Sequence, residues 1–90
     1  MGRSFFHLHL VSDSTGETLL AVSRAASAQY QGISAIEHIY PLVRNNAQLD
    51  RVLQEIEETP GVVLYPLVDR SIADRLELAC RDQGCPCLSV

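Results

Sequence analysis

The sequence predicts a three-layer α/β fold around a four-stranded parallel sheet. Four short apolar segments alternate with longer segments whose apolar residues recur at helical spacing. The first and third apolar segments are nearly continuous, which is typical of strands buried on both faces of a parallel sheet. The resulting order, β-α-β-α-β-α-β, requires right-handed crossovers that place helices on both faces.

The first strand is predicted over residues 5–11, where only two histidines interrupt an apolar run. A polar turn at 12–16 follows, and the next apolar residues repeat at helical spacing from 17 to about 30. Gly32 suits the end of this helix because glycine adopts the left-handed conformation that helix C-termini require.

A second strand is predicted over 36–40. Asn45 or Asn46 can cap the helix that follows it. That helix carries one apolar stripe, made of Leu49, Val52, Leu53 and Ile56. Pro60 and Gly61 end it.

The third strand is predicted over 62–68, where β-branched residues predominate. Asp69 can cap a helix over 70–83, and Gly84 ends it. A fourth strand begins at 87. We expect a flavodoxin-like or Rossmann-like strand order, 2-1-3-4.

The chain is interpreted as one α/β domain, residues 1–90, from the amino-terminal part of a longer protein. Its last residues lie within an apolar strand, and a strand edge left bare favours dimerisation or aggregation.

The net charge of −4 argues against binding to nucleic acid or anionic membranes. No apolar run reaches the roughly 20 residues of a membrane span. Since the N-terminus has no signal-peptide pattern, we expect a cytoplasmic protein with reduced thiols at Cys80, Cys85 and Cys87.

All seven basic residues are arginines. The absence of lysine excludes a Schiff-base lysine and a complete Walker A loop, whose lysine contacts the β- and γ-phosphates. Any phosphate chemistry in this chain must therefore use arginine, backbone amides or helix N-termini.

In parallel α/β sheets, ligands bind outside the carboxyl ends of the strands. The polar residues that follow the first three strands are predicted to converge there and to suit a phosphate or carboxylate. We call this set the polar edge; it comprises Ser12, Asp13, Ser14, Thr15, Gly16, Glu17, Arg44, Asp69 and Arg70. No member is assigned a catalytic role.

The segment 12–17 allows two interpretations. It can be an anion cradle, in which Gly16 permits close backbone approach and Ser14 and Thr15 donate hydroxyls. It also matches a capping box, in which Ser14 and Glu17 satisfy the first amides of the helix. The two compete for the same amides, and the pattern favours the cap. Asp69 is likewise expected to be an N-cap, and Arg44 and Arg70 are more often solvated surface charges than anion ligands.

Histidines 7 and 9 share one face of the first strand, and His38 lies on the next strand. Three imidazoles could hold zinc, but mid-strand positions are covered by helices, so hydrogen-bonded histidines are expected instead of a metal site. The C-x-C spacing at Cys85 and Cys87 is weak evidence for metal or redox use, and structural thiols are expected.

Several strings of the sequence resemble one bacterial family, the regulatory proteins of pyruvate, phosphate dikinase and phosphoenolpyruvate synthase. They are HLVSDSTGET at 9–18, VSRAA at 22–26, AQY at 28–30, YPLVR at 40–44, PGVVLY at 60–65 and LVD at 67–69. The resemblance covers nearly the whole chain, and its most specific part is VSDSTGET.

The resemblance implies a bifunctional parent protein. Such proteins use ADP to phosphorylate a threonine of the dikinase or synthase, and inorganic phosphate to remove that phosphoryl group with release of pyrophosphate. Their P-loop-like nucleotide site lies in a C-terminal kinase domain outside this chain. The 90 residues are therefore expected to need no cofactor of their own and to be inactive alone.

Two functions remain open for this domain. It can supply part of a phosphate or substrate crevice through the polar edge. Alternatively, it can be a non-catalytic module that binds the target enzyme or a small anion.

Overall fold

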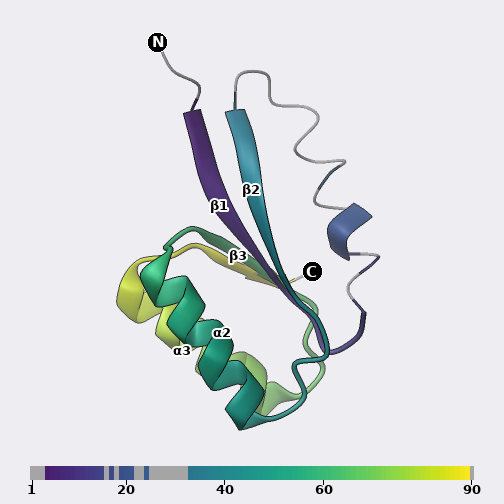
Figure 1. The fold of residues 1–90 in the computed structure, drawn as a ribbon. Helices are drawn as coiled ribbons and strands as arrows, with labels where there is room; N and C mark the ends of the chain where they lie inside the picture. Colours follow the sequence, from purple (N-terminus) through teal and green to yellow (C-terminus); the bar gives the residue numbers. More distant parts are fainter. Residues whose placement is uncertain (1–3, 16, 18, 22–23, 25–32, 90) are drawn as a thin grey trace.

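A computed structural model describes residues 4–15, 17, 19–21, 24 and 33–89. It confirms the predicted four-stranded parallel sheet and its order, β2-β1-β3-β4 (Figure 1). The strands are β1 (Ser4–Val11), β2 (Ile33–Tyr40), β3 (Val62–Tyr65) and β4 (Cys87–Ser89).

The two halves of the sheet differ in length. Strands β1 and β2 pair over their full eight residues, from the Ser4–Ile33 pair to the Val11–Tyr40 pair. Strand β3 joins β1 only from the Leu8–Val62 pair to the Leu10–Leu64 pair. The amino-terminal ends of β1 and β2 therefore extend beyond the rest of the sheet (Figure 1).

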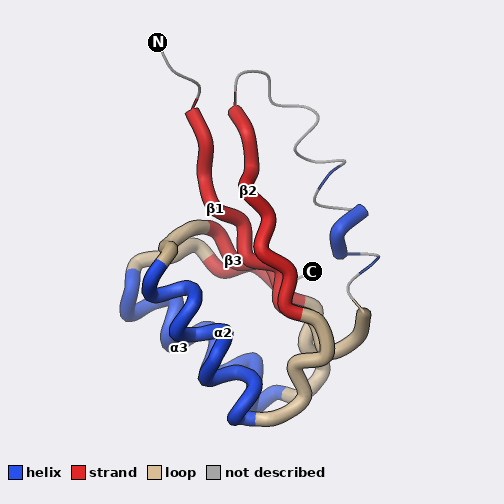
Figure 2. Tube along the Cα trace, viewed as in Figure 1, coloured by secondary structure: helices blue, strands red, loops and turns tan. Residues whose placement is uncertain are grey.

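Helices α2 (Asn46–Glu58) and α3 (Arg70–Gln83) lie side by side on one face of the sheet (Figure 2). Their bounds and caps agree with the sequence: Asn45 and Asp69 are the N-caps, and Gly84 adopts the left-handed conformation with φ of 73°. The buried residues between these helices and the sheet form the larger core cluster, which includes Val11, Leu49, Ile56, Val63 and Leu76.

The opposite face of the sheet carries the described part of the first predicted helix. Residues 17, 19–21 and 24 have helical backbone, and Leu19 packs with Leu8 and Leu10 in a second core cluster. Arg24 forms an ion pair with Glu37 of β2 at 3.6 Å. Helices therefore cover both faces, which confirms the three layers. The predicted end of this helix, residues 30–32, lies outside the described residues.

Two predicted strand boundaries are wrong. The third strand ends at Tyr65 rather than at residue 68, because Pro66 has no N–H for the ladder and Val68 is 83% exposed. The second strand begins at Ile33, three residues before the predicted start at 36, because β1 provides a paired partner along its whole length.

The three cysteines are free thiols, with Cys80 and Cys85 buried and Cys87 half-buried. Burial raises the pKa of Cys80 to about 12 and also raises the pKa of Cys87. Both thiols therefore stay protonated, as the structural interpretation expects. Among the described residues, no helix is long and apolar enough to cross a membrane.

Candidate functional site

Asp13 connects the loops that follow three strands. Its backbone carbonyl accepts a hydrogen bond from Nε of Arg44, in the loop after β2, at 3.0 Å. Its carboxylate accepts the backbone N–H of Val68, in the loop after β3, at 3.2 Å. The carboxyl ends of β1, β2 and β3 thus meet around one residue, as the parallel topology predicts.

The loops after β1 and β2 are also joined through their backbones. Ser12 donates its N–H to the carbonyl of Tyr40 at 3.0 Å and accepts the N–H of Val43 at 2.9 Å. Ser14 accepts the N–H of Leu42 at 2.9 Å. These bonds continue the parallel pairing past the ends of the strands and hold the two loops in one fixed arrangement.

The turn after β1 presents hydroxyl groups at this edge. Ser12 is fully buried, and its Oγ accepts the N–H of Ser14 at 3.0 Å and lies 3.0 Å from Oγ of Ser14. Ser14, Thr15 and Glu17 are exposed. Gly16, on which both the anion cradle and the capping box depend, lies outside the described residues.

Leu42 has a backbone conformation that is costly for its residue type. Its φ of 59° lies in the left-handed region, which a leucine adopts at a cost of roughly 1–2 kcal/mol. The hydrogen bond from Leu42 to Ser14 holds this conformation, and the leucine side chain is 43% exposed. Backbone strain of this kind is characteristic of functional loops.

Arg44 is the basic residue whose side chain is held at the polar edge by a hydrogen bond. Its N–H donates to Oε1 of Gln48 at 2.7 Å, while its Nε donates to Asp13. Within the described part of the chain, no hydrogen bond or ion pair involves its two terminal nitrogens. A guanidinium held at Nε and open at both terminal nitrogens is suited to bidentate contact with an oxyanion.

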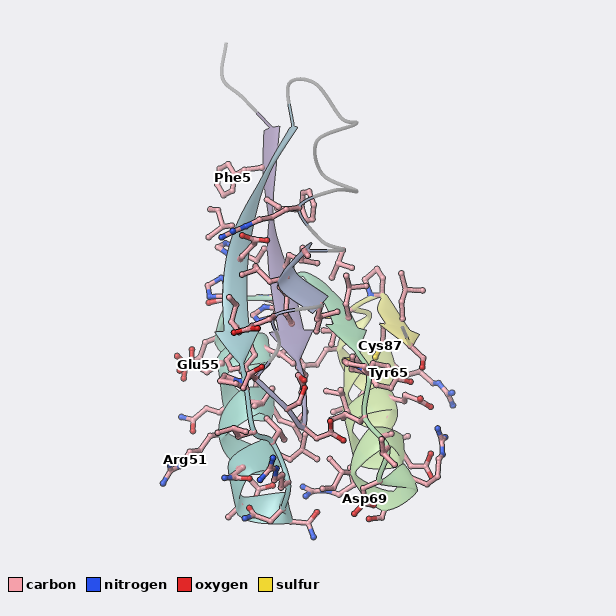
Figure 3. The ribbon with its side chains drawn as sticks, turned by 90° about the vertical axis from the view of Figure 1, so that its right-hand side faces the viewer. Phe5, Arg51, Glu55, Tyr65, Asp69 and Cys87 are labelled. Atoms are coloured by element: carbon pink, nitrogen blue, oxygen red, sulfur yellow. The ribbon has the colours of Figure 1, made fainter. Side chains whose placement is uncertain are left out.

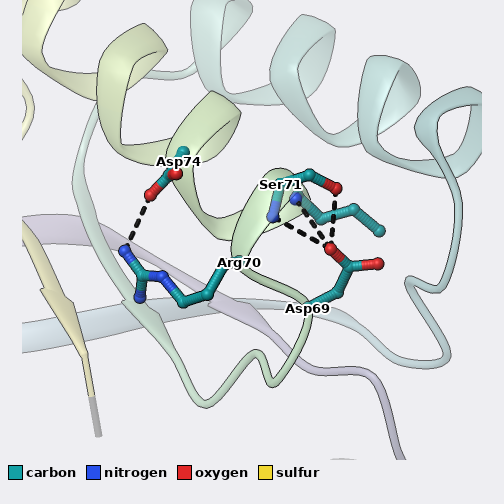
Figure 4. A network of polar contacts seen from close by, with 5 residues as sticks. Asp69, Arg70, Ser71 and Asp74 are labelled. Carbon is teal, nitrogen blue, oxygen red and sulfur yellow. Dashed lines mark hydrogen bonds and ion pairs between the residues drawn. The ribbon is translucent and has the colours of Figure 1, made fainter.

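The side chains of Asp69 and Arg70 instead interact with residues at the start of α3 (Figure 4). Oδ1 of Asp69 accepts the N–H and the hydroxyl of Ser71, at 2.9 and 2.7 Å, and the N–H of Ile72 at 3.4 Å. These bonds, that from the Ser71 hydroxyl foremost, lower the pKa of Asp69. Arg70 pairs with Asp74 at 2.7 Å. The capping interpretation of Asp69 is confirmed.

The histidines form a hydrogen-bonded cluster beneath the C-terminal end of α2, as predicted. His9 is fully buried; its Nε2–H donates to the carbonyl of Thr59 at 2.6 Å, and its Nδ1 accepts the hydroxyl of Tyr40 at 2.8 Å. Nδ1 of His7 lies 3.0 Å from Nε2 of His38. Burial lowers the pKa of His9 and raises that of Tyr40 to about 12. No group of histidine, cysteine or acidic residues placed to hold a metal occurs among the described residues.

Sequence reasoning assigned no role at this edge to Leu42 or Val68. Leu42 contributes a strained backbone, and Val68 contributes a backbone N–H. Neither has a side chain that signals a polar site, so composition and spacing could not identify them.

Comparison with known proteins gives consistent matches. A family model described as kinase/pyrophosphorylase matches residues 8–90. A protein of Nitrobacter winogradskyi is 64% identical over 85 residues, covering 94% of this chain and 30% of its own length. One from Rhodopseudomonas palustris strain BisA53 is 62% identical over 87 residues, covering 97% of this chain and 31% of its own length.

A third relative, from Afipia carboxidovorans, is 54% identical over 88 residues, which is 98% of this chain and 31% of that protein. All three carry the name of a pyruvate, phosphate dikinase regulatory protein. The chain thus spans about 30% of the length of these curated relatives.

Proposed function

Because this chain belongs to the kinase/pyrophosphorylase family, we propose that it forms part of a regulatory protein of pyruvate, phosphate dikinase or phosphoenolpyruvate synthase. In this proposal the whole protein transfers the β-phosphoryl group of ADP to a threonine of its target and leaves AMP. The reverse regulation transfers that phosphoryl group from threonine to inorganic phosphate, which forms pyrophosphate and restores the threonine hydroxyl.

We assign the polar edge to the phosphate or target side of this reaction. This assignment rests on the two hydrogen bonds that Asp13 accepts, one from Arg44 and one from Val68 in the loop after β3. They bring Arg44 and that loop to one place. Phosphoryl transfer depends on positioning and on neutralising the charge of the phosphoryl oxygens. Arg44, with its open terminal nitrogens, and the exposed hydroxyls of Ser14 and Thr15 supply groups of that kind.

The nucleotide is assigned to another part of the protein. A chain without lysine has no Walker A lysine for the β-phosphate of ADP. Of the other candidates at this edge, Asp69 and Arg70 are engaged within the first turn of α3. These 90 residues therefore orient an oxyanion or a target loop, and ADP is held by the C-terminal kinase domain. The three free thiols fit a reducing cytoplasm.

A second function is favoured by one different observation. Leu42 is 43% exposed and Val68 83% exposed, so apolar side chains flank the polar edge. Such a surface suits a module that binds the target protein without taking part in the chemistry. Retention of the dikinase by the immobilised 90-residue chain, without any binding of phosphate or ADP, would favour this module.

The test uses the full-length protein with Asp13→Ala and Thr15→Val. Loss of a hydrogen bond to a charged group costs about 1.5–3 kcal/mol, so we expect kinase and phosphorylase kcat/KM values about 10- to 100-fold lower. Glu57→Ala, which removes an exposed carboxylate at the far end of α2, is the matched control. Unchanged rates in both directions for the two edge variants would refute the assignment.

A further inference from the structure

The outer edge of β4 and the hollow between β4 and α3 form a second surface, and no residue of the polar edge lines that hollow. We infer that they are the docking surface for a further β-strand and its crossover helix, contributed by the part of the full-length protein that this chain does not span. This inference concerns the assembly of the fold and does not depend on the reaction proposed above.

Strand β4 has backbone N–H and C=O groups on the side away from β3, where a further strand could pair with them. Val63 of β3 donates its N–H to the carbonyl of Pro86 at 2.9 Å. Since successive residues of a strand direct their backbone groups to opposite sides, Leu88 also faces β3, whereas Cys87 and Ser89 direct theirs outward. Among the described strands, β4 pairs only with β3. An edge of this kind is a template for strand addition.

A hollow of about 510 Å³ runs beside this edge, between β4 and α3. It is lined by Tyr65, Glu77, Arg81, Cys85, Cys87 and Ser89. Figure 3 shows Tyr65 and Cys87 close together at this side of the molecule. A second hollow, of about 290 Å³, adjoins it and includes Leu78, which is 56% exposed.

The side chains of this surface suit a helix as the occupant. Glu77 and Arg81 line both hollows, and neither takes part in an ion pair among the described residues. Leu78, which is 56% exposed, provides apolar area beside these charges. An amphipathic helix packed here would bury Leu78 and pair these two charges.

The handedness of the fold places a helix at the same position. From β2 to β3 to β4 the crossovers pass through α2 and α3, which both lie on one face (Figure 1). Parallel crossovers within one sheet are right-handed in almost all proteins. A strand added outside β4 by another such crossover would place its helix on this face, next to α3. The hollow lies there.

The length of the relatives supports an occupant from the same polypeptide. This chain spans 30–31% of them, so their remaining length is ample for one strand and one helix. A second copy is the weaker candidate, because a stable interface needs roughly 800 Å² from each partner and a three-residue strand offers little of that. Addition within one chain also avoids the entropy cost of association.

Amide hydrogen exchange in the full-length protein tests the inference at single residues. We expect the outward amides of Cys87 and Ser89 to be protected as strongly as the inward amide of Leu88, by about 100-fold or more over a free strand edge. Protection of Leu88 alone would overturn the inference. Protection of Cys87 and Ser89 that disappears on dilution would identify a second copy and would also overturn it.

A pair of variants in the full-length protein provides a second measurement. Leu78→Lys should lower the Tm by several degrees, because the leucine is buried by the added helix. Ala47→Lys, at an exposed position of α2, is the control and should leave the Tm nearly unchanged. Equal Tm values for the two variants would contradict the inference.

Discussion

The carboxylate of Asp13 accepts the backbone N–H of Val68 at 3.2 Å, across 55 residues of sequence. This bond fixes the loop after β1 against the loop after β3, while the carbonyl of Asp13 holds Arg44. One acidic residue thus sets the relative position of all three loops at the polar edge.

Asp13→Ala should reduce the stability of the chain modestly. The bond lies at an exposed site, so we expect the free energy of unfolding to fall by about 0.5–1.5 kcal/mol in urea denaturation. Asp13→Asn keeps a side-chain oxygen that can accept from Val68 and should lose less. If the alanine and asparagine variants were equally stable, the Val68 bond would contribute nothing.

Gly61→Ala should be strongly destabilising. A Cβ at this position would collide with the backbone carbonyl of His7, so we expect a loss of about 3 kcal/mol or more. Gly84→Ala is the comparison: its Cβ meets nothing within 4 Å, and only the positive φ of 73° costs energy, about 1 kcal/mol. Thermal unfolding of both variants measures the difference. A Gly61→Ala variant as stable as Gly84→Ala would show that β1 and β3 are less closely packed than described.

His9 should make the fold less stable in mild acid. Burial lowers its pKa in the folded state, with smaller contributions of the same sign from His38 and His7, while the Thr59 carbonyl and Glu55 act in the opposite direction. Below pH 6.5 the unfolded chain binds a proton at His9 that the folded chain does not, so stability falls until the folded-state pKa is reached.

Urea denaturation of wild type and His9→Gln at about pH 7.5 and about pH 5, on either side of the ordinary histidine pKa of roughly 6.5, measures this effect. The glutamine variant lacks this titration and should show a shallower decrease in stability below pH 6.5. Parallel pH profiles would mean that His9 takes up its proton in the folded state as readily as in the unfolded state.

Asp69 should contribute to stability at neutral pH and lose that contribution in strong acid. The hydrogen bonds from Ser71 and Ile72 lower its pKa below 3.8, so the contribution is complete above pH 3.8 and disappears as the pH falls through the folded-state pKa. Asp69→Ala should therefore lower the Tm by a few degrees at pH 7, and the difference from wild type should shrink in acid. Asp69→Asn, which retains a capping oxygen that does not titrate, should keep most of the Tm at both pH values.

The sequence predicts the layers, the strand order and both caps of α3, because these depend on local signals. Asp69 and Gly84 are residue types that helix ends require, and the apolar stripe from Leu49 to Ile56 has helical spacing. The strand boundaries could be predicted less well from the sequence. Ile33 is paired only because β1 runs alongside it, and Val68 is excluded from β3 by the proline two residues earlier.

The location of the polar edge could be predicted from the sequence, but the hydrogen bonds within it could not. Parallel topology brings the loops together, but the acceptor for Arg44 and the donor to Asp13 are backbone groups, which every residue has. The sequence could not show that Arg70 pairs with Asp74 while Arg44 remains open.

Titration of the protein with inorganic phosphate, followed through backbone amide NMR signals, detects anion binding at the polar edge residue by residue. We expect saturable shifts at Asp13, Ser14 and Arg44, and their loss in Arg44→Gln, while the amides of α2 beyond Asp50 stay unchanged. An absence of shifts at these three residues, or shifts of equal size throughout the chain, would contradict an oxyanion site at this edge.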